Sequence, residues 1–181
     1  ALTEGADIAA INGPLSTVVS GDEESVLAVA ARFAHRKTTR LRVSHAFHSG
    51  RMDPMLDEFA RVAEKLTYDE PRIPIVSTVT PGATVSTPDY WVRQVRAAVR
   101  FHDGVRHLET LGVTRFVELG PDATLTALAT ESLTGDDILV TPTMRKDGDN
   151  RDTDGDEHVS VLTALARLYV SGRTPDWRAV Y

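Results

Sequence analysis

The start of the chain carries the hydrophobic and polar pattern of two short β-strands. Residues 8–11 form an apolar run closed by the turn sequence Asn-Gly-Pro, and residues 16–20 are rich in β-branched side chains and end at Gly21. Short β-branched or apolar runs bounded by Gly and Pro are typical of strands. We therefore predict that the two runs form a hairpin-like pair.

A helix and a third strand are predicted to follow the hairpin. Apolar residues recur at helical spacing from Val26 to Phe33, after a capping Asp22 and before the basic residues 36–37. Residues 39–43 then alternate apolar and basic side chains, which is the pattern of a strand. The order strand, strand, helix, strand matches the second half of a ferredoxin-like βαββαβ unit, whose opening strand and helix would lie upstream.

The rest of the chain alternates between helical and strand-like patterns. Helices are predicted at 53–66, 89–111, 124–133 and 159–170, and strands at 73–79, 115–119 and 138–141. Alternation at this spacing favours a mostly parallel sheet with helices packed on it, so we expect an α/β fold. Residues 146–158 are polar and rich in Asp, which is typical of a solvated linker. Residues 147–157 also resemble a calcium loop, but Arg151 and Glu157 stand where that loop cannot accept them.

Composition narrows the classes of function. The chain has 181 residues, of which 41% are hydrophobic, enough for one globular domain with a sizeable core. Its net charge of -6 comes from intermixed acids and bases, so no basic stripe offers itself to nucleic acid or anionic lipid. The absence of cysteine excludes disulfides and thiolate metal sites. No apolar run approaches the roughly 20 residues of a membrane helix. We expect a cytoplasmic protein that binds neither nucleic acid nor membrane.

The densest group of chemically capable side chains is at residues 44–49, which read Ser-His-Ala-Phe-His-Ser. They follow a predicted strand, and open α/β folds tend to place working groups at strand ends. A histidine there can take a proton from a hydroxyl nucleophile if a carbonyl or carboxylate holds its other ring nitrogen. A metal site is disfavoured because no cysteine and no evident third ligand accompany the two histidines. On these residues alone, a polar loop with hydrogen-bonded histidines is an open alternative.

Four separated motifs resemble those of one family. Residues 42–49 (RVSHAFHS) resemble the HAFH signature of acyltransferase domains in modular polyketide synthases, and residues 11–21, 90–101 and 117–121 resemble further motifs in the family's order. The resemblance covers nearly the whole chain. It implies an α/β fold composed of part of a ferredoxin-like small subdomain (1–46), the C-terminal part of an α/β-hydrolase-like large subdomain (47–144) and a post-acyltransferase linker (145–181). The active site would lie between the two subdomains.

The resemblance implies a two-step acyl transfer. In the family, a serine accepts an acyl group from coenzyme A and passes it to the phosphopantetheine thiol of an acyl carrier protein. That serine belongs to a Gly-His-Ser-x-Gly segment, which does not occur in this sequence, and the family's malonyl-binding arginine, which follows the segment, is missing as well. Because the chain also begins at Ala1 without a Met, we expect a piece of a longer chain that transfers nothing by itself. The rival hypothesis is a catalytically inactive docking or structural fragment of the synthase.

Roles for single residues follow from their motif positions in the family. His48 matches the general base that deprotonates the serine and later the carrier thiol. Gln94 matches the position whose main-chain carbonyl orients that histidine. His45 and Ser44 begin the same motif and are expected to line the substrate pocket. Asn12 matches an asparagine near the active site, although a turn position explains it equally well.

Phe47 carries the inference about substrate choice. In the family, HAFH accompanies malonyl units and YASH accompanies methylmalonyl units, so the resemblance implies malonyl-CoA as substrate. The physical interpretation is that the ring fills the space that an α-methyl group needs. A methyl group is worth about 1–3 kcal/mol in a pocket, which predicts a preference and not an absolute filter. The alternative is that Phe47 is an ordinary core residue. No metal and no covalently bound cofactor are expected.

The resemblance also implies partners. They are the N-terminal half of the acyltransferase domain, a ketosynthase domain with its linker, and an acyl carrier protein. The end of the chain resembles a linker whose aromatic residues, here Trp177 and Tyr181, pack on the ketosynthase region. Because the absent half would supply central strands, this chain alone is expected to expose apolar sheet edges and to be prone to aggregation.

Overall fold

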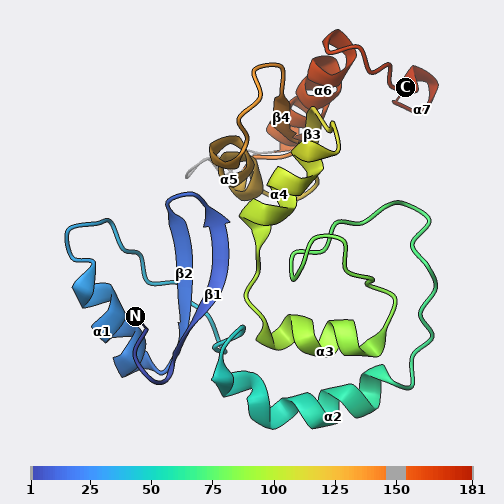
Figure 1. Ribbon diagram of the computed structural model, residues 1–181. Coiled ribbons are helices and arrows are strands. Elements are labelled where there is room, and N and C mark those ends of the chain that lie inside the picture. The colour runs from blue at the N-terminus through green and yellow to red at the C-terminus, as the bar shows by residue number, and fades with distance from the viewer. Residues whose placement is uncertain (1, 146–153, 181) are drawn as a thin grey trace. The chain divides into compact units, whose positions relative to one another are not determined.

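The computed structural model describes residues 2–145 and 154–180, with backbone only at 154–156. The chain separates into two compact units, Ala1–His107 and Leu108–Tyr181 (Figure 1). Tyr181 and most of the predicted linker 146–158, including most of the stretch 147–157 that resembles a calcium loop, lie outside the described residues.

The first unit begins with the predicted hairpin. β1 (Ala6–Gly13) and β2 (Ser16–Gly21) pair in antiparallel register, so this prediction is confirmed. α1 (Glu23–Arg32) follows and packs on the hairpin, as Figure 1 shows. It ends at Arg32, earlier than predicted. Phe33, with φ -110° and ψ 25°, leaves the helical conformation and caps the last turn.

Two packed helices form the other part of the first unit. The short 3-10 helix η1 (Gly50–Met52) leads into α2 (Asp53–Ala63), which packs against α3 (Pro88–Arg96). α3 begins one residue before its predicted start. Pro88 lies in its first turn, and the Thr87 hydroxyl caps the helix by accepting a hydrogen bond from the Tyr90 amide. Tyr90 then packs into a small core with Val79 and Val85.

Two predicted strands of the first unit are absent from the structure. Residues 39–43 and 73–79 form no strand, and the apolar members of the first alternation, Leu41 and Val43, are 56% and 70% exposed. A strand requires a neighbouring backbone to receive its hydrogen bonds, and alternation in sequence does not supply one. These segments have the sequence pattern of strands without a paired neighbour in the described part of the chain.

The predicted helix 89–111 is two helices. α3 ends at Arg96 and α4 (Phe101–Thr110) begins five residues later. Between them, Ala97 is extended, with φ -75° and ψ 151°. The Val99 amide donates to the Ala9 carbonyl at 2.8 Å, and the Val99 carbonyl accepts from the Ile11 amide at 2.8 Å. These bonds form a parallel bridge to β1 in place of two helical bonds, so contact with a distant strand interrupts the helix.

The second unit contains a parallel strand pair. β3 (Arg115–Glu118) and β4 (Leu139–Pro142) pair in parallel, with α5 (Thr124–Ser132) between them in sequence. α5 and α6 (Asp154–Val170) both contact β4, and α7 (Trp177–Val180) ends the described chain. The predicted α/β alternation is confirmed here. α6 begins at Asp154 and not at Val159, so the last part of the predicted linker is helical.

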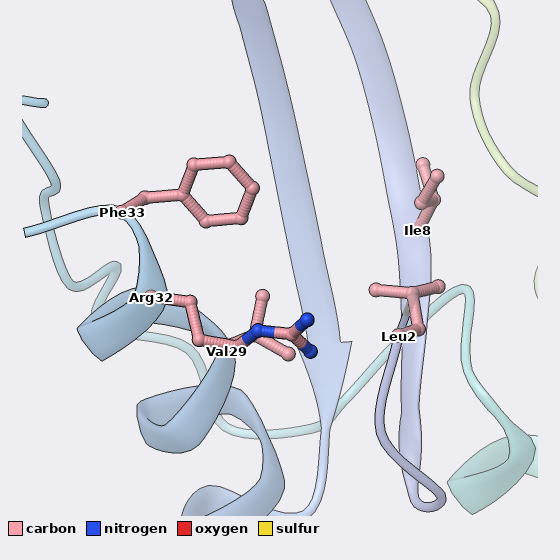
Figure 2. A pocket seen from close by; sticks show the side chains of 5 residues that line it. All are labelled: Leu2, Ile8, Val29, Arg32 and Phe33. Carbon is pink, nitrogen blue, oxygen red and sulfur yellow. The ribbon is translucent and has the colours of Figure 1, made fainter.

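A hollow of about 520 Å³ lies in the first unit between α1 and the chain entering β1. Figure 2 shows Val29, Arg32 and Phe33 on the helix side and Leu2 and Ile8 on the other. The lining is mainly apolar, and it includes none of the residues that the sequence marks as chemically capable. We therefore place the candidate site elsewhere.

Candidate active site

The site is organised around the segment that joins α3 to α4. Because α3 stops at Arg96, the carbonyls at its end have no next helical turn to bind and are open to other donors. Val99 is fixed against β1, and the Arg100 amide donates to the Thr78 carbonyl at 2.6 Å. The segment therefore ties β1 and the chain before α3 to the end of that helix.

His48 is bound to this segment through its backbone and its ring. Its amide donates to the Val95 carbonyl at 3.1 Å, and its ring Nδ1 lies 2.7 Å from the Ala97 carbonyl. A carbonyl can only accept, so Nδ1 carries a proton, and in the neutral ring the free lone pair is on Nε2. The ring is partly exposed. The contact selects the neutral tautomer in which Nε2 can accept a proton.

The residue that orients the histidine differs from the prediction. The expected acceptor was the carbonyl of Gln94, but the structure uses that of Ala97. The reason is local: Gln94 lies inside α3, whereas Ala97 is its extended C-terminal cap. The carbonyl beyond the helix end is thus the one that turns toward the ring, and Gln94 acts at most by belonging to the same helix.

The backbone at His48 is in the left-handed region, with φ 61°, and no other non-glycine residue among those described has a positive φ. This conformation is rare for residues with a side chain and costs about 1–3 kcal/mol. Surrounding contacts therefore hold it in place. Ser49, whose side chain is fully buried, donates from its hydroxyl to the Ala46 carbonyl at 2.6 Å and accepts from the Arg51 amide at 3.3 Å.

The other predicted site residues lie close in sequence but are less constrained. The Phe47 ring is 48% exposed and lies 6.2 Å from the His45 ring and 6.3 Å from the His48 ring, measured between centroids. His45 is exposed and its Nδ1 is 3.0 Å from the Ser44 hydroxyl. Asn12 is partly buried in β1, two positions after Ala10, which bridges Val99.

Three charged residues lie beside residues 48–50, which we call the histidine loop, and the sequence did not predict their role there. The Gly50 amide donates to Asp7 Oδ2 at 2.9 Å. Arg96 binds the same oxygen through a terminal nitrogen at 3.3 Å and binds Asp53 Oδ1 through Nε at 2.8 Å. Asp7 lies on β1, Asp53 on α2 and Arg96 on α3. No local pattern links positions so far apart, so nothing in the sequence signalled this cluster.

Comparison with known families identifies the family of this chain. Residues 3–175 match the family described as "Acyl transferase domain". The chain belongs to the acyl transferase domain family. The resemblance of the four sequence motifs is thereby confirmed at the level of the family, and so is the α/β fold.

Relatives of this acyl transferase domain chain are polyketide synthases. It is 50% identical over 180 residues to polyketide synthase GfsA of Streptomyces halstedii, and 46% identical over 188 residues to the phenolphthiocerol synthesis polyketide synthase type I Pks15/1 of Mycobacterium marinum. It covers 97% and 99% of its own length in these matches, but only 2% and 9% of the relatives.

Solved acyltransferase structures share its fold. The acyltransferase domain from the second module of the salinomycin polyketide synthase is 51% identical, with a TM-score of 0.87. A Synechocystis malonyl-CoA:ACP transacylase is 28% identical, with a TM-score of 0.65. The acyl transferase chain spans 41% of the first structure and 48% of the second. Within the described residues, no helix of the chain is long and apolar enough to cross a membrane.

Proposed function

We propose that this chain supplies the histidine-bearing part of an acyltransferase that moves a malonyl unit from coenzyme A to an acyl carrier protein. The observation that carries the proposal is the 2.7 Å contact between His48 Nδ1 and the Ala97 carbonyl. It holds the ring in the tautomer whose Nε2 can accept a proton from a hydroxyl. Membership of the acyl transferase family supports the reaction class.

In the first half-reaction, His48 acts on a serine that this chain does not contain. Nε2 takes the hydroxyl proton as the serine oxygen forms a bond to the thioester carbon. When the carbon–sulfur bond breaks, the imidazolium returns that proton to the departing coenzyme A sulfur. The products are a malonyl-serine ester, free coenzyme A and a neutral imidazole.

In the second half-reaction, the same nitrogen serves the carrier. Nε2 removes the proton of the phosphopantetheine thiol, the sulfur attacks the ester carbon, and the serine oxygen leaves with the proton. A backbone carbonyl orients the ring throughout, where other triads use a carboxylate. The carbonyl fixes the tautomer without adding a full negative charge, so the ring alternates between neutral and protonated forms without an ionised partner.

Phe47 is proposed to favour malonyl over substituted malonyl units. Phe47 is 48% exposed and its ring centroid lies 6.3 Å from that of His48, so the residue is accessible beside the proposed base. A bulky ring there would oppose a substituent at the malonyl α-carbon. One structural relative was solved in complex with 2-(pent-4-yn-1-yl)malonyl, which shows that a 35% identical acyltransferase accommodates a large α-substituent.

Partners and cofactors are proposed on the same basis. A structural relative is a malonyl-transacylase bound to a type II polyketide synthase acyl carrier protein. The curated relatives are far longer than this chain. We infer that phosphopantetheine enters on a carrier protein, and that the serine segment, a ketosynthase domain and its linker belong to the same synthase.

The test is acylation of a chimaera. The part of the salinomycin second-module acyltransferase domain that this chain does not match is joined to this chain, and intact mass is measured after incubation with malonyl-CoA or methylmalonyl-CoA. We expect a malonyl adduct, with H48A slowing its formation by at least about 100-fold. H35A removes an exposed histidine outside the motif, so it is the matched control and should retain most of the rate.

Two outcomes would contradict the proposal. Equal acylation rates for H48A and the unchanged chimaera would show that His48 is not the general base. No adduct in the chimaera, alongside normal acylation of the intact salinomycin domain, would favour the rival function of a structural or docking piece.

A further inference from the structure

Three charged side chains from three different elements meet at Gly50, two residues after His48. A β-carbon added to Gly50 would lie 3.6 Å from Asp53 Oδ2, 3.7 Å from an Arg96 terminal nitrogen and 3.8 Å from Asp7 Oδ2. The cluster thus surrounds the residue at which the histidine loop turns into η1. Its members come from α2, α3 and β1, so it joins all three elements at this point.

Arg96 also occupies a special place along the backbone. Its neighbours on either side, Val95 and Ala97, provide the two carbonyls that hold the amide and the ring of His48. The side chain of Arg96 meanwhile bridges Asp7 and Asp53, and Asp7 holds the Gly50 amide. Arg96 therefore connects the backbone that binds His48 to the aspartates that lie around Gly50.

We propose that Arg96, through Asp7 and Asp53, is a positioning residue for His48. It holds the end of α3 and the start of η1 in the relative position at which His48 Nδ1 donates to the Ala97 carbonyl. The consequence of losing it is a ring that leaves this carbonyl and samples the other tautomer. The proposal rests on the function proposed for His48 as base, and it goes beyond that function by naming what holds the base.

The exposure of the three side chains indicates that their ion pairs orient the histidine loop more than they stabilise the fold. Arg96 and Asp7 are 36% and 37% exposed and Asp53 is 59% exposed, so water screens both ion pairs and their contribution to folding is small. The ion pairs contribute more to fixing the relative orientation of the three elements than to the free energy of folding. Arg96 uses two different nitrogens for two carboxylates, a fork that a lysine ammonium cannot reproduce at the same geometry.

The direct test is the tautomer of His48 in this chain, measured by long-range ¹H–¹⁵N correlation NMR. The ring nitrogens of the unchanged chain should show the Nδ1–H tautomer. In R96Q and R96K, signals of the Nε2–H tautomer should appear. The matched control is R93Q, since Arg93 is exposed on the same helix and forms no ion pair recorded for the described residues. R93Q should keep the original tautomer.

The kinetic test uses the chimaera with the salinomycin segment. R96Q should lower kcat for malonyl transfer by about 10- to 100-fold, because a misplaced base costs reactivity, with KM for malonyl-CoA changed by less than about 2-fold. R93Q should match the unchanged chimaera. Should R96Q fail to fold by circular dichroism, D7N decides in its place, because it keeps an oxygen for the Gly50 amide and removes one of the two carboxylate charges that bind Arg96.

The outcomes of the two tests are distinguishable. An unchanged His48 tautomer in R96Q and R96K, with kcat equal to that of R93Q, would overturn the positioning proposal while leaving His48 as base. Loss of the Nδ1–H tautomer in R96Q, together with a fully active H48A chimaera, would uphold the positioning and reject the catalytic function it serves.

Discussion

Residues 39–43 precede the motif 44–49 and residues 48–50 form its end, yet the two segments differ in how they are held. The first segment has a clear strand pattern but forms no strand, and Leu41 and Val43 are largely exposed. The second has no regular pattern, yet each residue is bound: His48 to the end of α3, Ser49 to Ala46, and Gly50 to Asp7. The difference teaches that the histidine loop takes its shape from distant elements and not from the segment that leads into it.

The sharpest way to break this comparison is V99P. Proline removes the amide that donates to the Ala9 carbonyl and cannot continue the bridge to β1. The lost bond alone should cost about 1–3 kcal/mol of unfolding free energy, with steric clash added. Urea denaturation followed by circular dichroism measures it. V99A keeps the amide and should cost less; equal losses would show that the bridge contributes nothing.

A smaller effect is expected from S49A. The Ser49 side chain is fully buried, and removing its hydroxyl leaves the Arg51 amide and the Ala46 carbonyl without this partner. The expected loss is about 1–2 kcal/mol, measured by the same denaturation. S44A is the matched control in the same motif, because Ser44 is exposed and bonds only its neighbour His45 in the described contacts. A change in S44A as large as in S49A would contradict the contrast between bound and unbound positions.

The smallest effect is expected in the segment before the loop. L41S replaces a side chain that is 56% exposed, so the unfolding free energy should change by no more than about 0.5 kcal/mol. Static light scattering should also show less self-association, because an exposed apolar side chain has been removed. A loss above about 1 kcal/mol would mean that residues 39–43 are packed after all, and the comparison would fail.

The elements that the sequence predicts correctly are those whose signals are local. The hairpin β1–β2, with turn residues between an apolar run and a β-branched run, was predictable for this reason. So were β3, α5 and β4, which follow each other as strand, helix and strand. The motif 44–49 was equally visible as a chemically capable group. Local chemistry was enough in each case.

The predictions that failed depend on partners that sequence does not show. The break between α3 and α4 arises because Val99 bonds to β1, about ninety positions earlier in the chain. The same break explains why Ala97 and not Gln94 holds the histidine. The cluster of Asp7, Asp53 and Arg96 was invisible because ordinary surface charges are common and their convergence is a property of the folded chain.

The left-handed backbone at His48 carries a consequence for engineering. Glycine adopts this conformation at no steric cost, so a search for thermostable variants that selects on folding alone would tend to install glycine at position 48. Such variants would pass a selection for folding after losing the imidazole that binds the Ala97 carbonyl. At this position, the backbone strain favours glycine and the base proposed for acyl transfer requires histidine, so directed evolution of the domain has to select for stability and transfer together.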